Sequence, residues 1–182
     1  MEEEPNERTE EQREKGNNLY LCYTNLLLII PVGYFLFNVR KETPKIEFLL
    51  AAMLLVVIYF SQQFWQNPIK HSQIHRIDAI FAKMTLLTFI VYTFYKFSNS
   101  FVHSLSSCLV LIAIATSFYF SNKYSNEEWC SNNHLCCHGL LHIFCFIATF
   151  YAFLPLEASS PLDVLTSDTL VPLDTFVVNK EL

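Results

Sequence analysis

The chain has 182 residues, of which 52% are hydrophobic and only 16% are charged, with a net charge of -5 and a mean hydropathy of +0.29. A soluble domain carries about 25% charged residues, so this composition predicts a membrane protein. The acidic charge lies mostly in the two tails and argues against nucleic acid as a partner.

Two polar tails flank a long apolar region. Residues 1–18 contain seven acidic and three basic residues and have no apolar face, which is typical of a disordered acidic tail. From residue 155 the chain turns to Ser, Pro, Asp and Thr, so we expect a loosely ordered polar tail over residues 155–182. The membrane domain is expected over residues 19–154.

Apolar runs divide this domain at about residues 19–37, 46–65, 77–97, 101–120 and 135–154. Each has roughly 19–21 residues, the length of an α-helix that crosses a hydrocarbon core about 30 Å thick. Aromatic residues gather at several of their ends, as they do at membrane interfaces. The predicted fold is all-α, a multi-pass transmembrane bundle of about five helices, with a kink at Pro31 in the first helix.

Orientation and location have weak signals in this sequence. Six Lys and Arg residues fall on the face that holds the N-terminus and five on the opposite face, so the positive-inside rule decides nothing. The C-terminal Asn-Lys-Glu-Leu only partly resembles an endoplasmic-reticulum retrieval signal. We expect an integral membrane protein of the endoplasmic reticulum or Golgi rather than of the plasma membrane.

Counting the membrane crossings shows which surface each polar residue of the apolar runs approaches. The second run ends, and the third and fifth begin, at the face that holds the N-terminus. The residues that should approach this one membrane surface are Ser61, Gln62, His71, His75, Asp78, His134, His138 and His142. Parity places His103 at the opposite surface.

Spacing selects the residues that can converge on a metal ion. Two histidines at i and i+4, such as His138 and His142, lie on one helical face and can bind a single ion. A third imidazole from His75 or His71 leaves a fourth position for water, as in catalytic zinc sites. We therefore expect zinc (Zn2+) held by His75, His138 and His142, with Asp78 bonded to a ligand imidazole or to the water. Zinc makes such a water a nucleophile near neutral pH.

These positions resemble the motifs of one membrane superfamily. A Ser near the end of one helix, a His and an Asp around the next helix start, and His-x3-His in the last helix are similar to the alkaline ceramidases, the progestin and adipoQ receptors, and the lipid-remodelling hydrolases. The matching positions are Ser61, His71 or His75, Asp78, His138 and His142.

The resemblance implies three zinc-binding histidines in a membrane bundle and hydrolysis of a lipid amide or ester, with Ser61 assisting at the oxyanion. It covers only residues 61–83 and 134–146. The superfamily has seven helices rather than five. Its Ser-x3-His spacing is also absent, because Trp65 follows Ser61 by four residues.

Several readings of the same residues stay open. The histidines can simply pack in the bundle and bond to hydroxyls or backbone, and two of them, such as His75 and His138, can ligate haem. Asp78 can complement the dipole of its helix, and Lys83 can snorkel or pair with Asp78. A second cluster, which can form a surface metal site, a disulfide or plain thiols, comprises Cys130, His134, Cys136, Cys137 and His138.

The sequence thus predicts an integral membrane zinc hydrolase that acts on a lipid amide or ester, or a degenerate relative of one. The alternative is a non-enzymatic multi-pass protein, a structural or accessory subunit, whose His and Asp side chains hold helices together. A channel or transporter is disfavoured because the polar groups gather at one surface. The expected partners are membrane lipid and either a second copy or another membrane protein.

Overall fold

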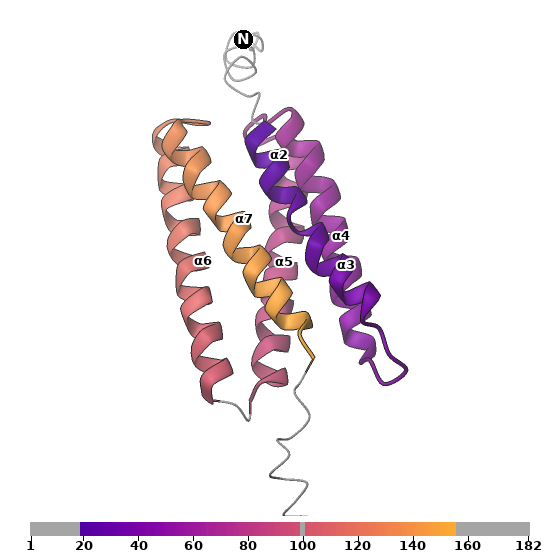
Figure 1. Cartoon of the computed structure of the whole chain (residues 1–182). Helices are drawn as coiled ribbons and strands as arrows, with labels where there is room; N and C mark the ends of the chain where they lie inside the picture. The colour runs from indigo at the N-terminus through magenta and orange to yellow at the C-terminus, as the bar shows by residue number, and fades with distance from the viewer. Residues whose placement is uncertain (1–18, 99–100, 156–182) are drawn as a thin grey trace, which may run out of the picture.

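The computed structural model describes residues 19–98 and 101–155, which form helices and short connections without any strand (Figure 1). The tails predicted over residues 1–18 and from 156 onward lie outside this part of the chain. Five stretches are long and apolar enough to cross a membrane: Leu19–Phe37, Lys45–Gln66, Gln73–Lys96, Phe101–Glu127 and Asn132–Phe153. The prediction of an all-α, multi-pass membrane protein is confirmed.

The first crossing is two helices rather than one kinked helix. α2 spans Leu19–Leu26 and α3 spans Ile29–Phe37. Proline has no N–H and its ring clashes with the carbonyl four residues earlier, which for Pro31 is the carbonyl of Leu27. That carbonyl accepts from the N–H of Ile30 instead, at 3.1 Å. The helix therefore breaks one turn before the proline.

Polar side chains fasten this broken crossing to α4, which spans Lys45–Gln66. Asn25 Nδ2 donates to the carbonyl of Ile58 at 3.1 Å, and Gln62 Nε2 donates to the carbonyl of Cys22 at 2.7 Å. Both bonds run between helices at membrane depth, where water cannot replace them.

The next helices extend beyond their apolar runs. α5 spans Gln73–Lys96, α6 spans Phe101–Glu127 and α7 spans Asn132–Phe153. α5 thus begins about four residues before the expected start, and α6 ends about seven residues after the expected end. Hydropathy marks the segment in hydrocarbon, whereas the helix ends are set by capping residues that lie in the interface.

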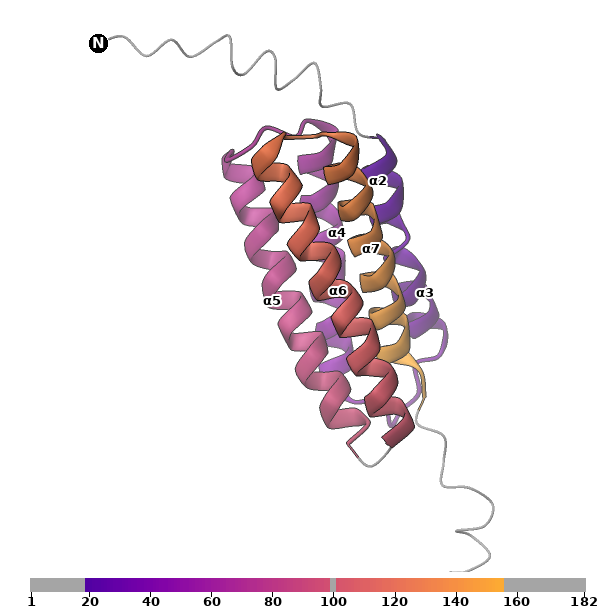
Figure 2. The same ribbon diagram turned by 90° about the vertical axis from the view of Figure 1, so that its left-hand side faces the viewer.

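α7 is the central helix of the bundle. It packs against α2, α3, α5 and α6, whereas α6 packs mainly on α7 and makes little contact with α5. Figures 1 and 2 show α6 on the outer side of α7. The bundle is therefore tightly closed between α4 and α5 but loosely closed between α5 and α6.

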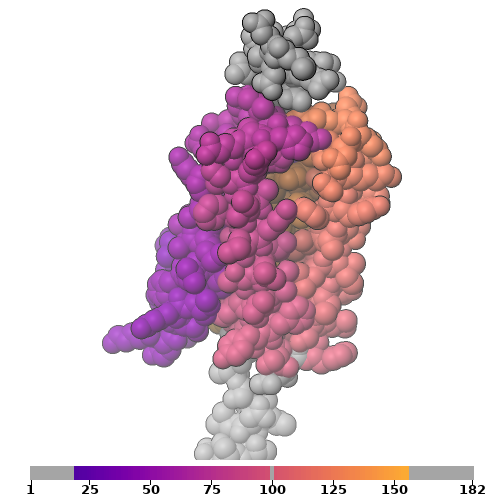
Figure 3. Space-filling view, turned by 180° about the vertical axis from the view of Figure 1, so that it is seen from behind, coloured from indigo at the N-terminus to yellow at the C-terminus, as the bar shows by residue number. Residues whose placement is uncertain are grey.

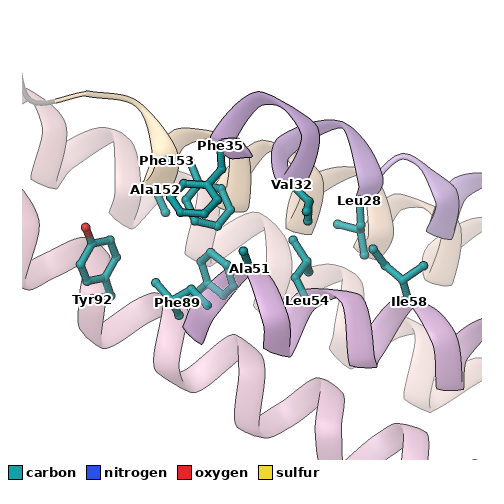
Figure 4. Close-up of a cluster of buried hydrophobic side chains, with 11 residues drawn as sticks. Leu28, Val32, Phe35, Ala51, Leu54, Ile58, Phe89, Tyr92, Ala152 and Phe153 are labelled. Atoms are coloured by element: carbon teal, nitrogen blue, oxygen red, sulfur yellow. The ribbon is translucent and has the colours of Figure 1, made fainter. Parts of the chain in front are cut away.

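An apolar cluster holds the half of the bundle that is farther from the N-terminus (Figure 4). Phe153 of α7 lies at its centre, with ring centroids 4.9 Å from Phe35 of α3 and 5.6 Å from Phe89 of α5. The residues that α4 contributes are Leu50, Ala51, Leu54 and Ile58. This half of the protein thus has a hydrophobic core, whereas the histidines of α5 and α7 lie in the other half.

A buried ion pair lies at the far end of this core. Lys96 Nζ is 2.8 Å from Glu47 Oε1, and both side chains are less than 10% exposed. The same carboxylate oxygen accepts from the Tyr92 hydroxyl, and Lys96 also donates to the carbonyl of Ala152 at 2.9 Å. These bonds join α4, α5 and α7.

Candidate functional site

A cavity of about 340 Å³ lies among α4, α5, α6 and α7. Its lining runs from His71 and Trp129 near the N-terminal ends of α5 and α7 to Thr93 and Ser107 toward the opposite surface. Figure 3 shows a hollow between α5 and α6, with α7 visible at its floor. Its volume falls within the range of about 300–1,000 Å³ that is usual for small-molecule sites.

The structure brings all five sequence-predicted site residues to this cavity. Ser61 comes from α4, His75 and Asp78 from α5, and His138 and His142 from α7. His71 and His134 line it as well. His103 lies at the other end of the bundle, where its ring stacks on Phe97 at 4.8 Å.

His142 is the α7 histidine farthest from the helix start, and its side chain is 8% exposed. Its Nδ1 lies 3.0 Å from the hydroxyl of Thr24, and that hydroxyl donates to the carbonyl of Leu21 at 3.1 Å. A hydroxyl has one proton, so Thr24 must accept from His142 Nδ1–H. The lone pair of His142 is thereby on Nε2, the nitrogen that can bind a substrate or an ion.

His138 lies one turn above His142, with its ring centroid 4.9 Å away. Its Nδ1 is 3.0 Å from the hydroxyl of Ser121 on α6, and its ring packs on Trp65 of α4 at 4.7 Å. A hydroxyl partner at Nδ1 fixes the orientation of an imidazole, as the outer partners of metal-binding histidines do. His138 and His142 are thus held alike, each by one hydroxyl from another helix.

His75 and His134 are held differently, in two copies of one capping motif. Ser72 and Ser131 are the N-caps of α5 and α7, and each accepts from the backbone N–H of the histidine three residues later. Each histidine in turn accepts at Nδ1 from a backbone N–H just before the cap, at 3.0 Å for His75 and 3.2 Å for His134. A neutral imidazole that accepts at Nδ1 carries its proton on Nε2.

Four buried polar atoms have no hydrogen-bond partner among the described residues, and all four belong to residues that line the cavity. They are Asn25 Oδ1, Trp65 Nε1, Asp78 Oδ1 and Thr85 Oγ1. An unsatisfied buried polar group costs about 1–3 kcal/mol. Because all four lie around one space, water or the polar atoms of a ligand in that space can satisfy them.

Aromatic rings close the cavity at the N-terminal face. Trp129 lies between His75 and His134, with ring centroids 5.5 and 5.0 Å away, and its Nε1 donates to the carbonyl of Pro68 at 3.0 Å. Lys70 Nζ lies 5.4 Å from the Trp129 ring centroid and donates to the carbonyl of Ser125 at 2.6 Å. These contacts tie the α4–α5 connection to the α6–α7 connection.

The histidines do not form a ready three-ligand metal site in this arrangement. Within residues 19–98 and 101–155, no three His, Cys, Asp or Glu side chains are grouped so that they could share one ion. His142 presents an unprotonated Nε2. His138 does so only if the Ser121 hydroxyl accepts from His138 Nδ1–H. The Nε2 of His75 is protonated by the capping arrangement, so His75 does not fit as the third ligand.

Sequence reasoning missed the partners that position these residues. Thr24, Asn25 and Ser121 are polar residues in or beside apolar runs, and only contacts between helices give them a role. The Cys and His cluster around Cys136 forms no metal site, and no disulfide joins the six cysteines, all of which lie in the described ranges.

No known protein family, curated protein or solved structure matches the chain. The resemblance to the ceramidase and adipoQ-receptor superfamily therefore stays a prediction.

Proposed function

We propose that this protein is an integral membrane hydrolase that takes an amide or ester of a membrane lipid into the cavity. The observation that supports it most is the group of unpartnered polar atoms around that space. An amide offers an N–H to Asn25 Oδ1 or Asp78 Oδ1 and a carbonyl to Trp65 Nε1–H. An ester offers only the carbonyl, so an amide satisfies more of these atoms.

The hollow between α5 and α6 supports entry from the membrane. Farther from the N-terminal face, the lining on both of these helices is mainly apolar. Its apolar residues include Leu86 and Phe89 on α5 and Val110 and Leu111 on α6. We propose that a lipid chain lies here while its linkage reaches the polar half. An endomembrane location stays part of this proposal.

The proposed chemistry assigns three roles to the lining residues. Asp78 Oδ1 accepts a proton from the attacking water, as a positioned carboxylate does in general base catalysis. Ser61, which is 3% exposed, donates to the carbonyl oxygen as negative charge develops there. The protonated Asp78 then gives its proton to the leaving amine nitrogen, or to the leaving oxygen of an ester, as the C–N or C–O bond breaks. His138 and His142 line the same space.

Zinc remains a proposal on the strength of the superfamily resemblance alone. His138 and His142 would supply two nitrogens, but a third ligand requires His75 to release the backbone N–H of His71. Since the present ligand set does not fit an ion, no step above depends on one. Elemental analysis of purified protein decides the point, with about one zinc per chain expected if His75 turns inward, and none in His138→Ala/His142→Ala.

The test of the hydrolase is fatty-acid release from lipid amides and esters by the purified protein in lipid nanodiscs, measured by mass spectrometry. Asp78→Asn keeps the shape of the side chain and should lower the rate about 10²–10⁴-fold, as the loss of a general base does. His103→Ala at the far surface is the matched control. Release that Asp78→Asn leaves unchanged would contradict the assignment.

The second candidate is the non-enzymatic protein, and one observation favours it. Four of the five cavity histidines are each held by a bond that also serves the fold, two at N-caps and two by hydroxyl contacts between helices: His75, His134, His138 and His142. This candidate predicts that His138→Ala/His142→Ala lowers the unfolding temperature, whereas no lipid is hydrolysed by any variant. It is the correct reading if the folded parent releases no fatty acid from any amide or ester tested.

A further inference from the structure

Lys83 is an exposed charge in the middle of a membrane-spanning helix. It is the eleventh of the 24 residues of α5, about 15 Å from the helix start at 1.5 Å per residue. Every other charged residue of the described spanning helices is closer to a helix end. A lysine at the centre of such a helix costs about 2.5–3.5 kcal/mol on insertion scales.

Among residues 19–98 and 101–155, no acidic side chain pairs with Lys83. The ion pairs among residues 19–98 and 101–155 join Lys96 to Glu47 and Lys123 to Glu127, and none includes Lys83. Asp78 is the nearest acid along α5, but five residues turn it to another side of the helix, and its Oδ1 has no partner. Of the two sequence expectations for Lys83, the pair with Asp78 is therefore not formed, and snorkelling is the other.

The neighbours of Lys83 form a surface that faces the lipid. Ile80 and Leu87, at i-3 and i+4, are each 60% exposed, and Met84 is 58% exposed. Lys83 also borders the cavity, so it stands at the rim of the hollow between α5 and α6. A cation on an apolar helix surface at this depth is stabilised by an anion at the same depth.

We propose that Lys83 is the docking point for a membrane-spanning helix of a partner protein that carries an Asp or Glu near its centre. A charge inside a membrane pairs with another charge, and a helix is the element that can hold a carboxylate at this depth. The apolar run of α5 begins six residues, or about 9 Å, before Lys83, so snorkelling to the headgroups is the competing outcome, which equal binding of acidic and neutral helices would show. The partner helix packs along Ile80, Met84 and Leu87, with its carboxylate against Lys83 Nζ.

A second copy of this chain does not supply that carboxylate. Glu47 is committed to Lys96 and Tyr92, and Glu127 lies in the last turn of α6. Asp78 is turned into the cavity, with a buried oxygen. The described helices thus present no exposed acid at the depth of Lys83, and the partner is a different protein.

The test uses the purified full-length protein in liposomes with synthetic leucine-rich transmembrane peptides, and association is measured by fluorescence energy transfer. One peptide carries a central Glu, a matched peptide a central Gln, and a third only leucine. The Glu peptide should bind about 5–30-fold more tightly than the Gln peptide, the range of polar contacts between membrane helices. Lys83→Met should abolish this preference, and Lys83→Arg should keep it.

Lys123→Met is the control, because Lys123 is exposed near the end of α6 and already faces Glu127 at 4.0 Å. It should leave the preference for Glu unchanged. Lys83→Met removes a charge from hydrocarbon and should fold at least as well as the parent, which circular dichroism checks. Equal binding of the Glu and Gln peptides, or a Glu preference that survives Lys83→Met, would overturn the proposal.

Discussion

At the scale of single residues, Lys96 and Lys83 show two fates of a charge in this membrane protein. Lys96 is surrounded by acceptors, the carboxylate of Glu47 and the carbonyl of Ala152, and lies 5.5 Å from the Tyr92 ring centroid. Lys83 has none of these. A buried pair is worth little relative to apolar residues of the same size, but breaking one leaves an uncompensated charge.

Lys96→Met should therefore lower the free energy of unfolding by about 3–5 kcal/mol, because Glu47 would stay buried without its cation. The double variant Glu47→Leu/Lys96→Met should recover most of that loss. Unfolding in mixed detergent micelles, followed by circular dichroism, measures both. The control Lys123→Met removes an exposed pair and should change stability by less than about 1 kcal/mol. A Lys96→Met protein as stable as the parent would show that the pair does not hold α4, α5 and α7 together.

At the scale of helices, the most regular feature is the duplicated start of α5 and α7. Both begin with Ser-x-x-His, and in both the residue before the Ser has a positive φ, 65° at His71 and 59° at Cys130. The Ser satisfies one backbone N–H at the helix start and the His satisfies another just before it. This is the reciprocal logic of a capping box, with His in the place of Glu or Gln.

Ser72→Ala and Ser131→Ala should each destabilise the protein by about 1 kcal/mol, the usual effect of losing an N-cap. His71→Gly should raise stability, since His71 is exposed and glycine adopts a positive φ at no steric cost. Thermal unfolding in detergent tests all three. Thr116→Ala, an exposed position on α6 whose hydroxyl bonds only to the carbonyl of Ile112, should shift stability by less than about 0.5 kcal/mol. If the two Ser variants behave like Thr116→Ala, the caps are not what fixes these helix starts.

The sequence predicted the number of crossings and their approximate places because hydrophobic length alone determines them. It also brought Ser61, His75, Asp78, His138 and His142 to one end of the bundle, because parity follows from counting helices. The break before Pro31 was expected as a kink, and the starts of α5 and α7 were missed although Ser-x-x-His was readable. Contacts such as Thr24 with His142 depend on how α2 packs on α7, which no local pattern contains.

At the scale of the whole molecule, the bundle is closely packed between α4 and α5 and hollow between α5 and α6. The apolar cluster around Phe153 and the Lys96 pair fix α3, α4, α5 and α7 together. α6 is held mainly by α7 and by contacts at its ends, such as the bond from Lys70 to the carbonyl of Ser125. This uneven packing leaves the cavity between α5 and α6 and makes it reachable from the membrane.

The hollow itself can be tested by filling it. Ala82 of α5 lines the cavity, and Ala82→Phe should place a ring in the path between α5 and α6. Binding of a fluorescent single-chain lipid amide to the protein in nanodiscs should then weaken about tenfold or more, since a ligand excluded from an apolar site loses about 0.8 kcal/mol per buried methylene. Ala115→Phe, at an exposed position of α6 outside the cavity lining, makes the same change on the lipid-facing surface and should bind the ligand as the parent does. Equal binding by Ala82→Phe and Ala115→Phe would mean that the lipid does not enter between α5 and α6, and that the unpartnered atoms of Asn25 and Asp78 are satisfied by water.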